Sequence, residues 1–261
     1  MIAPIFAPHK TPRLTLVGAG PGDPELITLK GINAIKSADV VLYDALVSEE
    51  ILKLIPAGVP ALSVGKRAGS HEYSQESINE LIVEFAYLYG HVLRLKGGDS
   101  FVFGRGSEEI EYAGAHGVHT SVVPGISSAL AVPASINIPV TARGISESFW
   151  VVTGTTKDGE ISCDVTLAAQ SKATVVILMG LRKIKDIMSL FEAHGKSETP
   201  VAVIQNGTLS NQKNVFGTVA TIASLSALEQ VGPPAIIVIG EVVGLAHVVK
   251  EVGGEAIGQY Q

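Results

Sequence analysis

The chain has 261 residues, of which 46% are hydrophobic and 17% charged, and its net charge is −6. This length suits two modest domains or one large one with a sizeable core, and the acidic balance argues against nucleic acid as the main partner. Prolines interrupt the longest charge-free run, residues 117–142. A spanning helix needs about 20 mainly apolar residues, so we expect no membrane span and predict buried loop and helix in this run.

The N-terminus lacks the charged start and apolar core of a secretory signal. Cys163 is the only cysteine, which excludes disulfides within the chain and fits a reducing compartment. We therefore expect a cytoplasmic protein, with the Cys163 thiol as a small core residue rather than a nucleophile.

Short apolar runs alternate with stretches whose apolar residues recur three and four positions apart. This alternation predicts strands and amphipathic helices, arranged as a largely parallel sheet with helices on both faces. In the first half, helices are expected at Leu26–Ser37 and Glu76–Tyr89, the second of which begins near Ser74. The expected strands are Leu14–Val17, Asp39–Tyr43, Ala61–Val64, His91–Leu95 and Thr120–Val123.

A second series of elements begins after Arg143 and Gly144, and it includes a helical stretch at Leu181–Ala193. We therefore predict two α/β domains, residues 1–141 and 142–261, with an active-site cleft between them. The expected strands of the second domain are Phe149–Thr153, Thr174–Met179, Val201–Gln205, Asn214–Gly217 and Ala235–Ile239.

The stretch LTLVGAGPGDP, residues 14–24, places three glycines at alternate positions after an apolar run. A dinucleotide-binding turn has the spacing G-x-G-x-x-G and leads directly into a helix. Here Pro21 offers no backbone N–H, and Asp23 and Pro24 delay the helix. The glycines alone leave two interpretations open, a nicotinamide-dinucleotide loop and a tight turn with a structural role.

Polar groups follow four of the predicted strands of the first domain. Asp44 ends the second strand, Lys66 and Arg67 follow the third, and the fourth leads into KGGDSFVFGRGSEE. The fifth leads into VVPGISSA. Because the carboxyl ends of parallel strands meet at one edge of a sheet, where open α/β sheets hold ligands, we expect these groups to lie together.

Eight stretches between Val17 and Thr208 resemble the tetrapyrrole methylases, in the order found in that family. The resemblance implies the tetrapyrrole methylase fold, not a Rossmann dinucleotide fold, and S-adenosylmethionine as cofactor, with S-adenosylhomocysteine as its product. The stretches are VGAGPGDPELITLKG, DVVLYDALVS, VGKRAG, RLKGGDSFVFGRGSEE, VVPGISSA, IPVTARG, ILMGL and QNGT.

The resemblance also implies which residues hold the cofactor. From the sequence alone, Gly97–Gly98 fits a turn equally well, and Met179 fits a core position better than a cofactor contact. Glycines allow the backbone to approach a ligand closely. The implied cofactor-binding residues are Pro21, Gly97, Gly98, Asp99, Val102, Ser127, Ser128, Met179 and Gly207.

The implied reaction methylates uroporphyrinogen III at two pyrrole carbons to give precorrin-2, as in sirohaem and cobalamin biosynthesis. Such chemistry needs alignment of the reacting atoms and a base for the departing proton. The resemblance implies Asp44 as proton acceptor and Lys66 as proton donor. Alternatively, Asp44 holds pyrrole N–H groups and Lys66 binds a substrate carboxylate. Arg105 with Glu108 is a rival acid–base pair at i, i+3, or a surface ion pair.

The implied substrate carries eight carboxylates, which suit Arg67, Arg143 and Arg105 because a guanidinium meets a carboxylate in two bonds. The resemblance implies a homodimer, and no metal is required. Departures from the family pattern are Ser100 for Pro, Ser107 for Gly, and Ala142 and Thr155 for His. They leave open a methylase that acts on a later precorrin. A non-catalytic ligand-binding module and a nicotinamide enzyme are the remaining alternatives.

Overall fold

The computed structural model describes residues 10–65 and 73–246. The chain forms two compact units, Met1–Ser127 and Ser128–Gln261. This boundary lies before the one after residue 141 that the sequence suggested, and the reason is the helix α5 (Ser128–Ser135). Its Ala129 and Val132 are buried in a core of the second unit, against Val238 among others.

The first unit contains a five-stranded sheet in the order β3-β2-β4-β1-β5, in which every neighbouring pair is parallel. The predicted parallel sheet is therefore confirmed for this unit. All five carboxyl ends lie at one edge, which is the edge where the sequence placed the polar groups. The strands are β1 (Arg13–Gly18), β2 (Val40–Tyr43), β3 (Ala61–Ser63), β4 (His91–Lys96) and β5 (His119–Val123).

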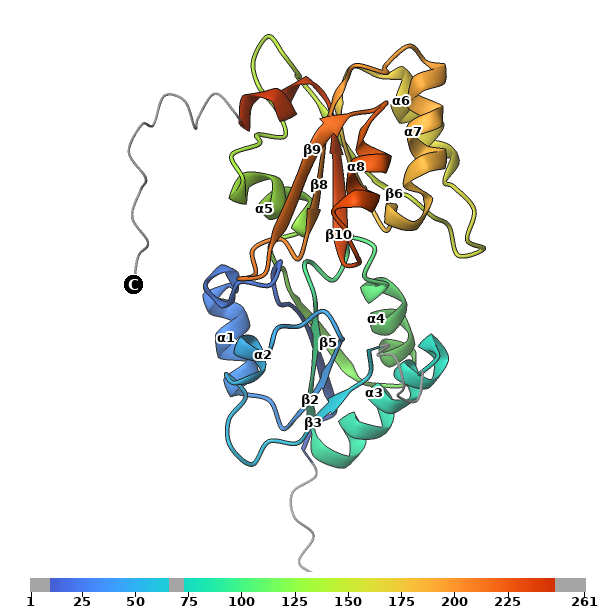
Figure 1. The fold of residues 1–261 in the computed structure, drawn as a ribbon. Coiled ribbons are helices and arrows are strands. Elements are labelled where there is room, and N and C mark those ends of the chain that lie inside the picture. The colour runs from blue at the N-terminus through green and yellow to red at the C-terminus, as the bar shows by residue number, and fades with distance from the viewer. Residues whose placement is uncertain (1–9, 66–72, 247–261) are drawn as a thin grey trace, which may run out of the picture. The chain divides into compact units, whose positions relative to one another are not determined.

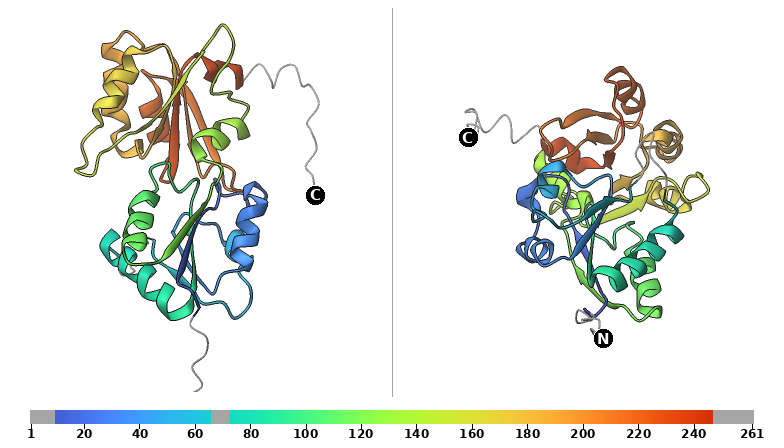
Figure 2. Two further views of the ribbon diagram at one scale, coloured as in Figure 1. Left: turned by 180° about the vertical axis from the view of Figure 1, so that it is seen from behind. Right: turned by 90° about the horizontal axis from the view of Figure 1, so that it is seen from below.

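Helices cover both faces of this sheet (Figures 1 and 2). On one face α1 (Leu29–Lys36) and α2 (Glu49–Leu52) cover a core that contains Val17, Leu93 and Leu95. On the other face α3 (Gln75–Tyr89) and α4 (Gly106–Ala115) cover a core that contains Leu14, Leu16 and Val92. Alternate residues of one strand therefore enter different cores, as the two-residue period of a strand requires.

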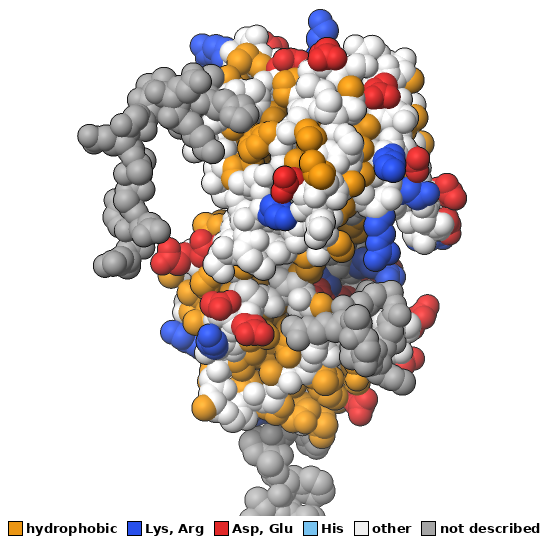
Figure 3. All heavy atoms as spheres, in the orientation of Figure 1, with side chains coloured by type: hydrophobic (Ala, Val, Ile, Leu, Met, Phe, Trp, Pro, Cys, Tyr) orange, Lys and Arg blue, Asp and Glu red, His pale blue; other side chains and the backbone are white. Residues whose placement is uncertain are grey.

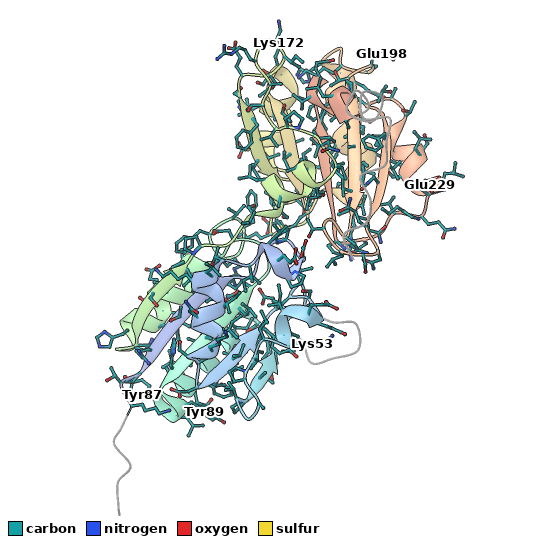
Figure 4. All side chains as sticks on the ribbon, turned by 90° about the vertical axis from the view of Figure 1, so that its left-hand side faces the viewer. Lys53, Tyr87, Tyr89, Lys172, Glu198 and Glu229 are labelled. Atoms are coloured by element: carbon teal, nitrogen blue, oxygen red, sulfur yellow. The ribbon has the colours of Figure 1, made fainter. Side chains whose placement is uncertain are left out.

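Capping residues decide where the first helices begin. Thr28 Oγ1 accepts a hydrogen bond from the Gly31 N–H (3.0 Å), so α1 begins later than the predicted Leu26. A short 3₁₀ turn, η1 (Pro24–Leu26), occupies the preceding residues, with Asp23 as its cap. Ser74 caps α3 as predicted (Ser77 N–H to Oγ, 3.1 Å). Tyr87 and Tyr89, labelled in Figure 4, mark the other end of α3.

The second unit also contains a five-stranded sheet, in the order β6-β7-β10-β8-β9. Only β6 and β7 are parallel in it, and the other three neighbouring pairs are antiparallel. The alternation of strands and helices did not predict this mixed sheet, because β10 enters between β7 and β8, and β9 pairs back on β8. The strands are β6 (Phe149–Thr153), β7 (Thr174–Leu178), β8 (Pro200–Gln205), β9 (Lys213–Thr218) and β10 (Ala235–Ile239).

One face of the second sheet packs against α6 (Cys163–Gln170), α7 (Ile184–Ala193) and α8 (Ile222–Leu228). The other face packs against α5 and the 3₁₀ turn η3 (Glu241–Gly244). A further 3₁₀ turn, η2 (Leu181–Lys183), precedes α7, so the predicted helix at Leu181–Ala193 is split. Cys163 is exposed at the first residue of α6. The expectation of a buried core thiol is therefore wrong.

Side chains of both signs of charge reach the surface of each unit, among hydrophobic ones (Figure 3). No helix within residues 10–65 and 73–246 is long and apolar enough to cross a membrane. The apolar content of the chain instead fills the cores on the faces of the two sheets.

Candidate active site

Three glycines meet backbone to backbone at the carboxyl edge of the first sheet. A Cβ on Gly18 would lie 2.5 Å from the Gly125 nitrogen, and one on Gly125 would lie 2.2 Å from the Gly98 oxygen. Gly20 and Gly98 also exchange two backbone hydrogen bonds (3.1 and 2.7 Å). The glycines after β1 therefore pack against the loops after β4 and β5, which supports the structural interpretation of LTLVGAGPGDP.

Asp99 fastens two of these loops to each other. Its Oδ1 accepts a hydrogen bond from the Phe101 N–H (2.8 Å), and its Oδ2 accepts one from the Gly125 N–H (3.0 Å). Bonds from backbone N–H groups to a charged oxygen are stronger than those to a neutral one. Asp99 therefore fixes the shape of the edge, whatever else it binds.

The loop between Asp99 and α4 exposes apolar side chains. Phe101, Val102 and Phe103 are 57%, 37% and 43% exposed, and Phe103 has a positive φ of 55°. Ser100 is buried beneath the loop, and its carbonyl oxygen accepts a hydrogen bond from the Gly106 N–H (3.1 Å). The Ser100 hydroxyl has no hydrogen-bond partner among the described residues. Apolar groups are thus offered to solvent while a hydroxyl is buried, the reverse of ordinary surface loops.

Arg105 and Glu108 form a two-bond ion pair at the start of α4 (2.8 and 2.6 Å). Their side chains are 54% and 49% exposed. The hydrogen bond with Glu108 raises the pKa of Arg105, and the same bond lowers the pKa of the Glu108 carboxyl. Both groups are stabilised in their charged forms, whereas a proton-transferring pair near neutral pH needs shifts in the opposite directions.

Asp44 follows β2 at the same edge, and its side chain is 28% exposed. Its carboxylate pairs with two cations of β4: Arg94 donates to Oδ1, and the Lys96 Nζ lies 3.7 Å from Oδ2. Both cations also contact Glu109 of α4, which is fully buried. The edge is therefore backed by an ionic cluster inside the first unit.

No role was predicted from the sequence for Arg94, Lys96 or Glu109. The available signal was HVLRLK, in which Arg94 and Lys96 alternate with apolar residues and share a face with Val92. Since Val92 is buried beneath α3 and α4, two cations on its face predict a buried anion on one of these helices.

The remaining predicted site residues are placed as follows. Lys66 and Arg67 lie outside the described residues. Pro21 is half-buried in the turn after β1, and Ser127 and Ser128 are half-buried where the first unit ends and the second begins. Arg143 is exposed on the second unit.

In the second unit Met179 follows β7 with its side chain exposed. It is 53% exposed and has a positive φ of 56°, so it is not the core residue that its apolar neighbours suggested. The Thr155 hydroxyl donates to the Met179 carbonyl oxygen (3.1 Å). Non-glycine residues with positive φ are strained and occur often at functional sites, so the chain holds this side chain outward at a cost.

Gly207 lies in the loop after β8, at the same edge of the second sheet, because Leu178 and Gln205 both pair with the start of β10. A Cβ on Gly207 would lie 2.3 Å from the Val132 Cγ1 of α5. Its neighbours Asn206 and Thr208 have positive φ values of 50° and 68°. This β-branched threonine is a genuine outlier, so backbone strain gathers at this edge.

The model of the tetrapyrrole (corrin/porphyrin) methylases matches residues 13–223. The chain is 46% identical over 237 residues to a uroporphyrinogen-III C-methyltransferase of Methanocaldococcus jannaschii, covering 90% of this chain and 98% of the relative. It is 46% identical over 245 residues to a siroheme synthase of Actinobacillus pleuropneumoniae, covering 94% of this chain but only 50% of that relative.

A similar fold is found among solved structures. The crystal structure of a uroporphyrin-III C-methyltransferase from Thermus thermophilus, in complex with S-adenosylhomocysteine, aligns with a TM-score of 0.78 and 37% identity. The alignment covers 89% of this chain and 99% of that one. From the family model, the relatives and the fold together, the chain belongs to the tetrapyrrole methylase family.

Proposed function

We propose that this chain is an S-adenosylmethionine-dependent methyltransferase that methylates uroporphyrinogen III at two pyrrole carbons and releases precorrin-2. The observation that carries the proposal is the 46% identity to the Methanocaldococcus jannaschii enzyme over 98% of that enzyme's length. The chain spans about half the length of the siroheme synthase that it matches. The proposal is accordingly limited to the methylation.

The residues present fit S-adenosylmethionine, which supplies a methyl group on a positively charged sulfur when bound. Its adenine needs apolar contacts. In the first unit Val102 has an exposed apolar side chain, and in the second unit Met179 has one. A Cβ built on Gly97 would lie 2.9 Å from the Leu46 Cβ, so glycine allows the backbone of this loop to lie close to Leu46. The residues proposed to hold the cofactor are Pro21, Gly97, Gly98, Asp99, Val102 and Ser127 of the first unit, and Ser128, Met179 and Gly207 of the second.

Asp44 is proposed to accept the proton that leaves the macrocycle after each methyl transfer. Its carboxylate is partly exposed at the edge of the sheet, and Arg94 and Lys96 hold it from behind. Glu108 is likewise paired with a cation, Arg105, so the choice of Asp44 over Glu108 rests on the family resemblance. Lys66 as proton donor, and Arg67 and Arg143 as partners of the substrate carboxylates, stay predictions from the family resemblance.

Turnover tests the proposal directly. Purified protein is incubated with S-adenosylmethionine and uroporphyrinogen III, and the products are identified by mass spectrometry. We expect the mass of two added methyl groups, a fall in turnover of about a hundredfold or more in Asp44→Asn, and normal turnover in Glu111→Gln, an exposed acid of α4. Absence of methylated product with the wild type would overturn the proposal. Preferential turnover of a precorrin would replace it with the alternative of a later methylation.

Calorimetry tests the cofactor site separately. We expect S-adenosylhomocysteine to bind the wild type and to bind Asp99→Ala much more weakly, since Asp99 fastens the loops after β4 and β5. Equal affinity of the two proteins would remove Asp99 from the cofactor site.

We also propose a homodimer, from the family resemblance. A mass of two chains in light scattering at micromolar concentration is expected, and the mass of one chain would contradict it.

A further inference from the structure

The ionic cluster beneath the edge of the first sheet has no role in the proposal above, beyond its contact with Asp44. Its members are Arg94 and Lys96 of β4, Glu109 of α4, Gln75 of α3 and Asp44 after β2. The side chains of Arg94, Lys96 and Glu109 are 2%, 4% and 0% exposed. Charges buried this deeply are costly unless they are paired and hydrogen-bonded.

Glu109 is the inner anchor of the cluster. Its Oε1 accepts hydrogen bonds from Lys96 Nζ (2.8 Å), Gln75 Nε2 (3.2 Å) and Arg94 Nε (3.3 Å). The donors belong to β4 and α3, and the acceptor belongs to α4. Glu109 therefore fixes the side chains of Arg94 and Lys96 relative to α4. One carboxylate balances one of the two positive charges, and a second anion is needed.

Asp44 supplies that second charge, and it alone among the cluster's ionised members reaches the surface, at 28% exposure against 4% or less. Arg94 donates through Nη2 to Asp44 Oδ1 and through Nε to Glu109 Oε1, so one guanidinium contacts both acids. The Asp44 N–H also donates to the Leu95 carbonyl oxygen (3.1 Å). The backbone of Asp44 is therefore fixed by Leu95, and its carboxylate is fixed by Arg94 on the side that faces the core.

A buried ionic cluster is a poor device for stability alone. Apolar side chains of similar volume would usually serve a core as well or better. What this cluster achieves, and apolar packing would not, is a fixed orientation of one carboxylate at the edge of the sheet. Groups that react must be held close to their productive geometry by supporting residues that are themselves locked.

We infer that Arg94 is the positioning residue of Asp44, locked in place by Glu109 and Lys96. It does not touch the reacting atoms, and it acts by holding the Asp44 carboxylate in the orientation that receives the proton. This inference rests on the proposed function, since it assigns Arg94 a part in the same proton transfer.

A double-mutant cycle on kcat tests the inference, with Arg94→Met and Asp44→Asn made singly and together. If Arg94 acts through Asp44, we expect Arg94→Met to lower kcat by about tenfold or more. In the Asp44→Asn background it should then change kcat by less than about twofold, because the group it positions is already lost. KM for uroporphyrinogen III and the affinity for S-adenosylhomocysteine should change by less than about twofold in Arg94→Met.

Two further variants separate positioning from folding. Arg94→Lys keeps a positive charge that cannot span Asp44 and Glu109 together, so we expect a kcat between those of the wild type and Arg94→Met. It also serves as the test protein if Arg94→Met fails to fold. Lys36→Met, which removes an exposed lysine of α1, is the matched control for loss of one charge and should retain wild-type kcat.

The outcomes are distinct. Losses in kcat that multiply in the double variant would overturn the inference and indicate a structural role for Arg94, while the turnover of the wild type would leave the proposed function intact. No turnover by the wild type would overturn the proposed function, and the inference with it.

Discussion

The two units present their candidate site residues by different physical means. In the first unit Asp44 is held at the edge of the sheet by charges buried between β4 and α4. In the second unit Met179, Asn206 and Thr208 stand at the edge in strained backbone conformations. Residues with positive φ occur at both edges, since Phe103 and Arg105 of the first unit have φ values of 55° and 58°. Among the described residues, only the first edge also has buried charged side chains beneath it.

The buried side chains of the two units reflect this difference. Among the described residues, the buried charged side chains Arg94, Lys96 and Glu109 all belong to the first unit. The buried polar residues of the second unit are serines and a threonine: Ser146, Ser162, Thr174 and Ser226. A charge in a core needs several partners from different elements. Strain in a loop instead needs a rigid, well-packed support, which β7, β8 and β10 provide.

Removal of Glu109 should have the largest effect. Glu109→Ala leaves Arg94 and Lys96 buried with one acid between them, so we expect a loss of about 3–5 kcal/mol in the free energy of unfolding. Urea denaturation near neutral pH measures it. Glu111→Ala, on the exposed side of the same helix, should stay within about 0.5 kcal/mol of the wild type. A small loss in Glu109→Ala would mean that electrostatics do not support the first edge.

Gly125→Ala tests the contact of the three glycine loops. The new Cβ would lie 2.2 Å from the Gly98 oxygen, within the backbone of another loop, and we expect a loss of about 3 kcal/mol. The matched control is Gly114→Ala in α4, where a Cβ meets nothing within 4 Å, so stability should rise by up to about 1 kcal/mol. Differential scanning calorimetry compares the two, and similar effects would contradict a close backbone contact.

Met179→Gly tests strain at the second edge. Glycine adopts a positive φ without cost, so we expect the free energy of unfolding to rise by about 1 kcal/mol. The affinity for S-adenosylhomocysteine should fall by about tenfold, if the side chain contacts the cofactor as proposed. Met179→Leu keeps both the strain and the apolar side chain, and should change neither quantity appreciably. A loss of stability in Met179→Gly would show that the side chain contributes more than the strain costs.

Two buried serines give effects of a size similar to that of Met179→Gly, with opposite signs. The Ser100 hydroxyl of the first unit has no partner among the described residues, so Ser100→Ala should gain up to about 1 kcal/mol. In the second unit the Ser146 hydroxyl accepts a hydrogen bond from the Thr174 N–H (3.0 Å) and donates one to the Ser148 carbonyl oxygen (3.0 Å). Ser146→Ala should therefore lose about 1–2 kcal/mol. Thermal unfolding of both variants measures the two changes in stability. Changes of the same sign would contradict the prediction.

Local patterns predicted most of the fold. All ten strands lie where the apolar runs are, and Ser74 begins α3 as its position before a helical stretch indicated. Asp44 and the GGD loop fall at the carboxyl edge of a parallel sheet, as the alternation of strands and helices implied. These features depend on residues only a few positions apart.

What the sequence did not predict depends on contacts between distant residues. The antiparallel pairs of the second sheet follow from where β10 inserts, and α5 joins the second unit through its packing there.

The sequence by itself determined the ten strands, three of the helical stretches and the residues at the strand ends. Tertiary structure alone decided which buried charges stand behind Asp44, because Arg94 lies 15 residues from Glu109 and 50 from Asp44. The residues next to a charged residue in a strand do not show which distant residue will pair with it. Its pairing is set only when a helix closes over the sheet and excludes water, which is also when an unpaired charge becomes costly.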